Sequence, residues 1–337
     1  MKRIVLIVLT AVFVMEVVSA SGATDRSQKS LKHFEFLPAV DYRFGETEYV
    51  LDAYGFDSLG RTIYVKSQLE FPLDGFSVGG ALRYTVDPQN PMPWVIRVGV
   101  STNLTEPKGI MRDRDWTNYW SDVYLPAVIE VSNTESDVTM NSVSLEAEVS
   151  KVIATNDKTE FRLFGGFRYQ WFDQEVIGFK GYQYNPRGDT MVTFDVPGLR
   201  GIDYTVSFYI PNAGLGAAMS LGEKASIAAH GAYALVIAKD RDDHLLRKKL
   251  STASVTGNGF IGGADVTIEM SRGRATPVYL TLSGEFVYLS ASGTQTQMYY
   301  GDDPSYPGDE TGESQPGIPH VIHSTQGRVG MEIGMRF

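Results

Sequence analysis

The chain has 337 residues and no cysteine, and its 40 acidic residues outnumber 30 Lys and Arg, which gives a formal net charge of −10. Because the basic residues are few and scattered, nucleic acid is not an expected partner. A small disulfide-stabilised scaffold is also excluded, so the stability of the chain has to come from one large cooperative architecture.

The N-terminal stretch has the pattern of a secretory signal peptide. Two basic residues precede an apolar stretch with two polar interruptions, and small residues follow. We expect cleavage after Ala20 or Ala23. A retained transmembrane helix is the alternative, but the apolar stretch is short and interrupted. The expected organisation is a signal peptide over residues 1–23 and one exported domain over 24–337.

Much of the exported domain alternates apolar and polar residues, which is the period of a β-strand with two different faces. In residues 142–149, for example, apolar side chains alternate with serine and glutamate. The expected strands, in chain order, are about 34–44, 61–71, 94–104, 141–151, 160–171, 201–210, 225–239, 253–270, 277–290 and 320–337. The segment 72–93 is either a further strand or a long connection.

The last residues, "RVGMEIGMRF", show the alternation most clearly, with every apolar side chain from Val329 to Phe337 on one face. A soluble antiparallel sheet or sandwich could alternate in the same way. A final aromatic residue behind a signal peptide instead resembles the closing strand of a bacterial outer-membrane barrel. No later apolar run reaches about 18 residues, so a membrane-spanning helix is not expected. We predict an all-β fold, a transmembrane antiparallel up-and-down β-barrel of about ten strands, with apolar side chains toward lipid and polar ones toward the lumen.

The C-terminus of a bacterial barrel lies in the periplasm, and counting strands backwards from it orients the others. The predicted long outer loops are 105–140, 172–200 and 291–319, with an outer loop or strand extension at 240–252. Two acidic motifs fall at this outer end, namely "IMRDRDW" at 110–116 and "KDRDDH" at 239–244. The same-face acids of both motifs are therefore expected at one mouth of the barrel.

Both motifs place carboxyl groups two residues apart, and on a strand such side chains share a face. Asp113 and Asp115 form one group, and Asp240, Asp242 and His244 form the other. A histidine paired with a carboxylate is held in one tautomer and can act as a general base toward water. Two close carboxyl groups can share a proton and hold that water, because like charges resist joint ionisation.

A barrel with a rim DxDW motif followed by DxDxH resembles the omptin family of outer-membrane proteases. Similar segments extend over most of the exported domain at low identity. They are "SQLEF" (67–71), "GFRYQW" (166–171), "GYQY" (181–184) and "PNAGLGAA" (211–218). The resemblance implies an aspartic-type endopeptidase that cuts next to Arg or Lys, with no cofactor and no metal.

The resemblance also implies roles for individual residues. Asp113 and Asp115 match the family's aspartate couple, and Asp242 with His244 matches its catalytic dyad. Asp240 matches the acid at the bottom of the pocket for a basic side chain, and Glu48 is the nearest candidate for the second pocket acid.

The expected partners are peptides or proteins with basic residues, and outer-membrane lipid. One departure concerns lipopolysaccharide, which omptins bind partly through an arginine on a strand matching 160–171. Here Trp171 stands at that place and Arg168 is displaced, which weakens the expectation that lipopolysaccharide is a partner.

Other interpretations compete with proteolysis. Aspartates in outer loops are usually solvated turn formers. A non-enzymatic barrel, either a narrow porin or an adhesin, is the alternative function, although about ten strands leave little open lumen. His320 and His323 could suggest a metal pair, but residues three apart on a strand lie on opposite faces.

Overall fold

The computed structural model describes residues 33–56, 59–120, 123–184, 190–271, 277–301 and 311–336. The expected signal peptide and Phe337 lie outside these residues. The described chain forms twelve β-strands, namely β1 (Phe34–Phe56), β2 (Thr62–Pro72), β3 (Gly75–Val86), β4 (Trp94–Asn103), β5 (Met111–Trp120), β6 (Val123–Thr155), β7 (Thr159–Tyr184), β8 (Met191–Ser220), β9 (Ala225–His244), β10 (Lys249–Ser271), β11 (Val278–Tyr299) and β12 (Ser314–Arg336). None of the described residues forms a helix long and apolar enough to cross a membrane.

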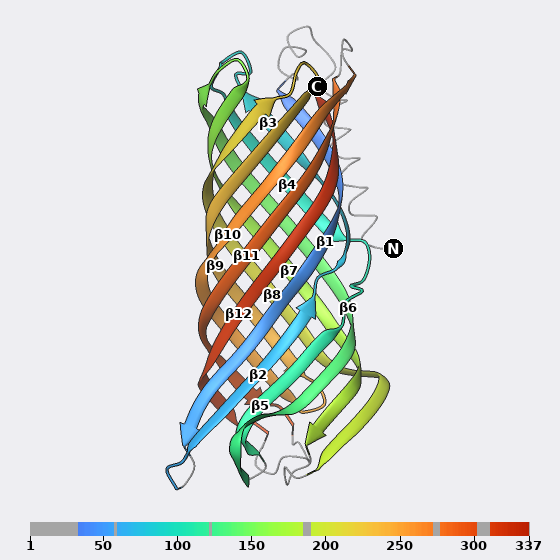
Figure 1. The fold of residues 1–337 in the computed structure, drawn as a ribbon, viewed down its shortest axis with the longest axis vertical. Helices are drawn as coiled ribbons and strands as arrows, with labels where there is room; N and C mark the ends of the chain where they lie inside the picture. The colour runs from blue at the N-terminus through green and yellow to red at the C-terminus, as the bar shows by residue number, and fades with distance from the viewer. Residues whose placement is uncertain are drawn as a thin grey trace.

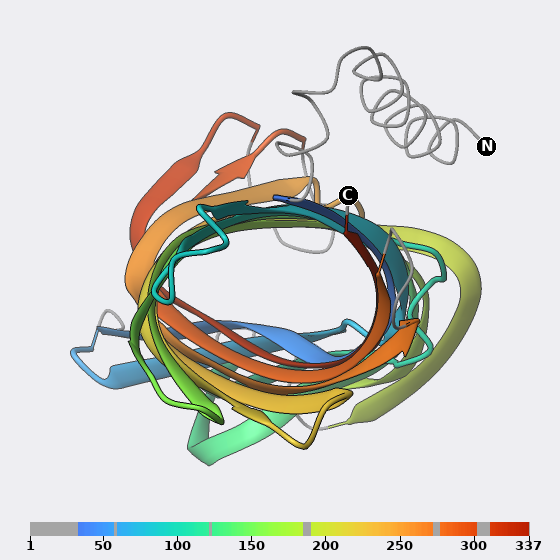
Figure 2. The ribbon, with the colours of Figure 1, turned by 90° about the horizontal axis from the view of Figure 1, so that it is seen from above.

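The strands close into one antiparallel barrel (Figures 1 and 2). Each strand from β6 to β12 pairs with the next in sequence, and β12 pairs with β1 to complete the ring. We call the end at which β12 finishes the proximal end, which is at the top of Figure 1, and the opposite end the distal end. Closure leaves no sheet edge, so backbone groups are satisfied within the barrel wall.

At two neighbouring positions in the ring, between β1 and β6, two short strands lie end to end in place of one long strand. Between β1 and β6, β3 and β4 complete the ring in the proximal half, and β2 and β5 complete it in the distal half. Each half of the described barrel therefore has ten strands, as predicted. The segment 72–93, which the sequence left open, contains β3 as the continuation of β2, followed by the connection to β4.

The predicted long loops at the distal end are largely strands. β5 and the first part of β6 occupy most of 105–140, and β7 and β8 extend through most of 172–200. The predicted loop 291–319 likewise contains the ends of β11 and β12, while its centre, 302–310, lies outside the described residues. Outward-facing residues of these extensions, such as Glu135, Asp137 and Thr139, are polar rather than apolar as on a lipid-facing strand.

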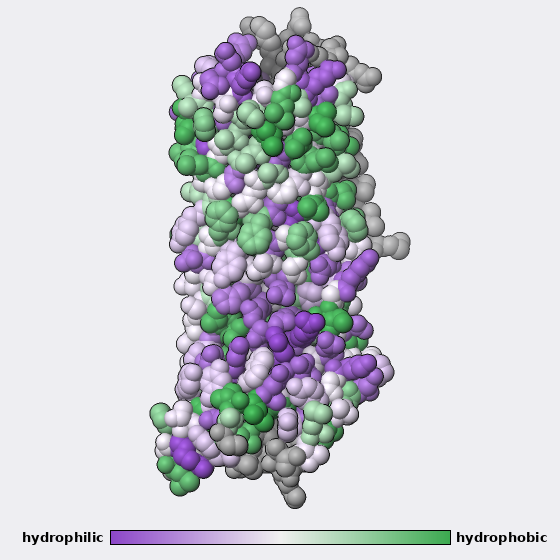
Figure 3. Space-filling view, in the orientation of Figure 1, coloured by the Kyte–Doolittle hydropathy of each residue, from purple (hydrophilic) through white to green (hydrophobic). Residues whose placement is uncertain are grey.

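The outer surface of the proximal half carries a belt of exposed apolar side chains, and the surface beyond it is more polar (Figure 3). Members of this belt include Leu82, Val98, Leu145, Leu163, Leu215, Leu235, Phe260, Leu282 and Met331. Such a band of apolar side chains is what a lipid-facing barrel surface requires. The distal half extends beyond the belt.

The proximal lumen is polar and charged. Arg168 forms ion pairs with Glu285 and Glu146, and Arg328 binds the same two carboxylates. These side chains line a cavity of about 680 Å³. Buried charges require such pairing, because the interior gives them little solvation.

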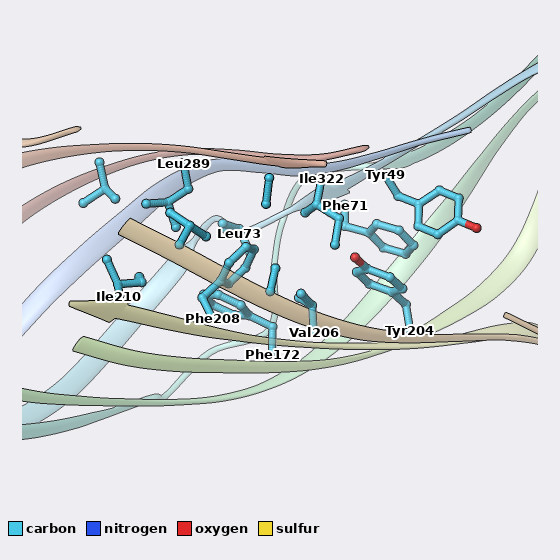
Figure 4. Packing of buried hydrophobic residues seen from close by; sticks show 14 of the residues in the cluster. Tyr49, Phe71, Leu73, Phe172, Tyr204, Val206, Phe208, Ile210, Leu289 and Ile322 are labelled. Atoms are coloured by element: carbon cyan, nitrogen blue, oxygen red, sulfur yellow. The ribbon is translucent and has the colours of Figure 1, made fainter. Parts of the chain in front are cut away.

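An apolar cluster closes the lumen between this cavity and the distal half (Figure 4). Its side chains come from opposite walls. Phe71 of β2 stacks on Tyr204 of β8, with ring centroids 4.2 Å apart. Phe172, Phe208 and Leu289 are fully buried in the same cluster. The acidic motifs lie on the distal side of this cluster, in the part of the lumen that we call the distal cleft.

Candidate active site

Asp113 and Asp115 lie on β5 and face the lumen. Asp113 stands opposite the buried Leu69 of β2, and Asp115 stands opposite Ser67. Directly opposed residues of an antiparallel pair share a face. The residue between the two aspartates, Arg114, points outward, where it binds Glu70. Alternation along β5 therefore presents both carboxyl groups to the distal cleft.

The segment that leads into β5 turns tightly before the strand begins. A Cβ atom at Gly109 would lie 2.5 Å from the Cβ atom of Pro72, so no larger residue fits there without displacement. Thr105 accepts the backbone N–H of Phe76 with its hydroxyl group. These contacts join the break between β4 and β5 to the break between β2 and β3, and so fix where β5 starts.

β9 carries the second motif at its distal end. The lumen-facing residues Asp240 and Asp242 are buried and alternate with the exposed Arg241. His244 Nε2 lies 2.9 Å from Asp242 Oδ2, and the imidazole retains 13% of its exposure. The carboxylate is almost fully covered, so it orients the ring while the ring itself reaches the cleft.

The two motifs converge although β5 and β9 are not neighbours in the ring. The pKa of Asp113 is raised well above its ordinary value, first by burial, then by the negative charges of Asp115 and Asp242. Lys249 and Arg247 oppose this shift. The structure thus gathers the four residues of the predicted catalytic set at one mouth of the barrel. Among the described residues, no group of three or more His, Asp or Glu side chains could hold a metal ion.

Lys249 is a cleft residue that the sequence did not single out. It is the first residue of β10, lies directly opposite His244, and is 8% exposed. Burial is the main cause that lowers its pKa to about 8, and Arg247 lowers it further, while Asp242, Asp115 and Asp113 raise it. Lys249 shares its face of β10 with the buried Ser251, two residues further along the strand.

Asp240 lies two residues deeper on β9 and does not present a free carboxylate to the cleft. Its Oδ2 atom is 3.0 Å from Nε2 of His320 on β12, and both side chains are at most 2% exposed. His323, three residues further along β12, stands opposite Glu48, whereas His320 stands opposite Leu51. The two histidines therefore face opposite sides of the wall, as strand geometry predicts.

The prediction that Glu48 contributes to the substrate pocket is wrong. Thr47 and Tyr49, on either side of it, are buried in the lumen, and Glu48 alternates with them. It stands opposite Glu70 and His323 on the outer face of the wall. The lumen positions nearest to it belong to Tyr49 and Thr47, so a tyrosine and a threonine occupy the region where a second pocket acid was expected.

A further motif that often carries a catalytic serine lies away from the candidate active site. Residues 75–79 read Gly-x-Ser-x-Gly, a pattern associated with serine nucleophiles on a sharp strand-to-helix turn. Here Ser77 lies within the uninterrupted strand β3, is buried, and stands opposite Asp41 and Asn103. It is a structural residue of the barrel wall.

Arg168 is not available to lipid. Both of its terminal nitrogens donate to Glu285 inside the barrel, at 3.0 and 2.7 Å. Trp171 alternates with the buried Phe172 and so faces outward. The position that carries a lipid-binding arginine in the resembling family thus offers an indole here.

Comparison with known proteins agrees with this geometry. The model of the omptin family matches residues 61–318. The chain belongs to the omptin family. A search of curated proteins finds no match. Among solved structures, the outer membrane protease OmpT from Escherichia coli superimposes with a TM-score of 0.70 at 15% identity, over 91% of this chain and 98% of that one.

Two other solved structures are much less similar to this omptin. A FadL homologue from Pseudomonas aeruginosa gives a TM-score of 0.29 at 10% identity, over 95% of this chain and 94% of that one. The translocator domain of the autotransporter NalP from Neisseria meningitidis gives 0.32 at 12% identity, over the whole of both chains. Both TM-scores are too low to indicate a shared fold.

Family membership makes this chain an outer-membrane β-barrel of a protease family. The matched range includes Asp113, Asp115, Asp242 and His244, but ends two residues before His320. The partner of Asp240 thus lies outside the part of the chain that matches the family.

Proposed function

We propose that this omptin is an outer-membrane endopeptidase in which His244 activates a water molecule at the distal mouth of the barrel. The observation that carries the proposal is the hydrogen bond between His244 and Asp242, on the side of the cleft that faces Asp113 and Asp115. We further propose that the distal end faces outside the cell and the proximal end faces the periplasm.

The chemistry follows from the tautomer that the hydrogen bond favours. When Nε2–H of His244 donates to Asp242, Nδ1 is free to accept a proton. Water loses a proton to Nδ1 as its oxygen bonds to the carbonyl carbon of the substrate. The imidazolium then returns the proton to the amide nitrogen as the carbon–nitrogen bond breaks.

Asp113 and Asp115 have a complementary role in this mechanism. Because burial and the neighbouring carboxylates raise the pKa of Asp113, the couple tends to retain one proton. A couple that is half protonated offers the attacking water both a donor and an acceptor. We propose that this arrangement holds the water between β5 and His244.

We propose a preference for peptide bonds next to basic residues. Support comes from the carboxyl groups of Asp113, Asp115 and Asp242, which favour a cationic substrate in the cleft. Lys249 opposes this attraction because it places a positive charge among the same carboxylates. Lipopolysaccharide is not proposed as a requirement, because Arg168 is engaged inside the barrel.

The alternative of a narrow porin is disfavoured by the apolar cluster that closes the lumen. Phe71 and Leu73 from one wall meet Phe172 and Phe208 from the other, and all four are fully buried (Figure 4). Ions do not cross such a layer without desolvation. The expected conductance of the refolded protein in planar bilayers is therefore no higher than that of the lipid alone.

A fluorogenic peptide that contains an Arg-Arg pair tests the proposed activity. Refolded wild type should cleave it, and His244→Ala should not, while both keep the heat-modified gel mobility of a folded barrel. His323→Ala is the matched control, since it removes an imidazole from the outer face of the same wall. Conductance together with an absence of cleavage by the wild type would instead favour the porin.

A further inference from the structure

The lumen of this omptin contains a second aspartate–histidine pair directly below the proposed dyad. Asp240 and His320 come from β9 and β12, which are not adjacent in the ring, and their hydrogen bond crosses the lumen. The imidazole is 0% exposed and the carboxylate is 2% exposed. A pair so deeply covered is not in position to activate water for a substrate in the cleft.

Two tyrosines cover the pair. The ring of Tyr49 lies 4.4 Å from the imidazole of His320, and Tyr49 also meets Tyr204 edge to face at 6.2 Å. Burial, followed by the charges of Asp240 and Asp242, raises the pKa of each tyrosine well above its ordinary value. Both therefore remain neutral phenols, and Tyr49 donates its hydroxyl hydrogen to Gln295.

The surroundings of Asp240 contain unused hydrogen-bonding capacity. Oδ1 of Asp240, Oδ1 of Asp242 and the hydroxyl of Tyr204 are all buried without a hydrogen-bond partner among the described residues. Buried polar atoms normally have partners. The three residues share one face of the paired strands β8 and β9, with Tyr204 directly opposite Asp242. Three oxygens on one face that can each accept a hydrogen bond form a suitable environment for a guanidinium or ammonium group, which carries only donors.

The imidazole that occupies this environment is held by few contacts. Nδ1 of His320 is buried and has no hydrogen-bond partner among the described residues, so the bond from Nε2 to Asp240 is the polar contact that retains the ring. The ring of Tyr49 also packs against it at a tilt, with the centroids 4.4 Å apart. Removal of the imidazole therefore breaks one hydrogen bond, the one to Asp240.

We propose that His320 is a specificity-determining residue that occupies the carboxylate of Asp240 and so keeps it from a basic substrate side chain. Asp240 selects an Arg or Lys side chain only when the imidazole is absent or displaced. In the wild type, Asp240 therefore adds little to the preference for basic residues that the carboxyl groups of Asp113, Asp115 and Asp242 provide. This inference depends on the proposed endopeptidase activity for its meaning in catalysis, but binding alone also tests it.

The kinetic test compares two peptides that differ only by Arg or Gln at the residue before the cleaved bond. His320→Ala should raise the ratio of kcat/KM for Arg over Gln by at least about tenfold, which corresponds to about 1.4 kcal/mol. The double variant Asp240→Asn with His320→Ala should return to the wild-type ratio, because the carboxylate that receives the cation is gone. His323→Ala should leave the ratio unchanged.

The binding test uses arginine amide and isothermal calorimetry on the same refolded proteins. His320→Ala should bind it at least about tenfold more tightly than the wild type, and the double variant should not. His320→Gln, which keeps a donor for Asp240, serves in place of His320→Ala if that variant lacks the gel mobility of a folded barrel. It should show a smaller gain in the same direction.

Unchanged ratios and unchanged affinities in folded variants would overturn the inference, and so would a lower ratio in His320→Ala. If the wild type cleaves neither peptide, the proposed function fails, and the calorimetric comparison still decides whether His320 withholds Asp240. Tighter binding in that case would support the inference as a statement about a cation site.

Discussion

The two aspartate–histidine pairs of this barrel have the same chemical groups and nearly the same bond lengths, 2.9 Å for His244 with Asp242 and 3.0 Å for His320 with Asp240. They differ in exposure, since the imidazole retains 13% in the first pair and 0% in the second. The first pair is local to one strand, and the second joins two strands across the lumen. Access to the cleft, rather than the pairing itself, separates a candidate base from a structural contact.

The largest expected difference between the pairs is in catalysis. His244→Ala should reduce kcat for the dibasic peptide by at least about 100-fold, because a positioned general base contributes about that much or more. His320→Ala should keep kcat for a neutral peptide within about tenfold of the wild type. Steady-state kinetics on refolded protein checks both values, and equal losses in the two variants would remove the distinction between the pairs.

For stability we expect the opposite order, with a larger loss in His320→Ala than in His244→Ala. His320→Ala leaves the carboxylate of Asp240 buried and unpaired, which should lower the free energy of unfolding by about 3–5 kcal/mol. His244→Ala also leaves a covered carboxylate unpaired, but water can enter the space left by the partly exposed imidazole, so the loss should be smaller, about 1–3 kcal/mol. Urea-induced unfolding in lipid vesicles measures both changes. A larger loss in His244→Ala would contradict the burial difference on which the comparison depends.

Substrate binding beside the His244–Asp242 pair should also depend on pH, because Lys249, which lies opposite His244, has a pKa of about 8. Below that pH the lysine is charged and repels a cationic peptide, and above it the lysine is neutral. KM for the dibasic peptide should therefore fall several-fold, by about 0.5–1 kcal/mol, as the pH rises through 8 in the wild type.

Lys249→Met should show the lower KM at every pH and lose this step. Lys248→Met is the matched control, since Lys248 is the exposed neighbour in the connection between β9 and β10. A step that persists in Lys249→Met would assign the titration to another group.

The smallest expected effect is that of Asp240→Asn in the otherwise unchanged chain. The asparagine oxygen can still accept the hydrogen bond from His320, and the carboxylate it replaces is already withheld from the substrate. The preference for Arg over Gln should change by less than about threefold, which is below 1 kcal/mol. A loss of tenfold or more in that preference would show that Asp240 is available to substrate in the wild type.

The sequence by itself determined the barrel, the shared faces of the acidic motifs and the family. Where one face of a strand meets lipid and the other meets the lumen, as in 142–149, alternation is strict and predicts both the strand and its orientation. The spacing of Asp113 with Asp115, and of Asp242 with His244, predicted their common faces for the same reason.

Which residues contact the faces that carry the acidic motifs was decided by the tertiary structure alone. Many outward-facing residues of the distal strand extensions, such as Glu135 and Asp137, are polar, so the pattern of a lipid-facing strand does not identify these extensions. Glu48 was misplaced because a shift of one residue on a strand moves a side chain to the opposite face. Lys249 and His320 are brought to the aspartates by strand pairing and by contact across the lumen, respectively, and no local pattern in the chain encodes contacts of that range.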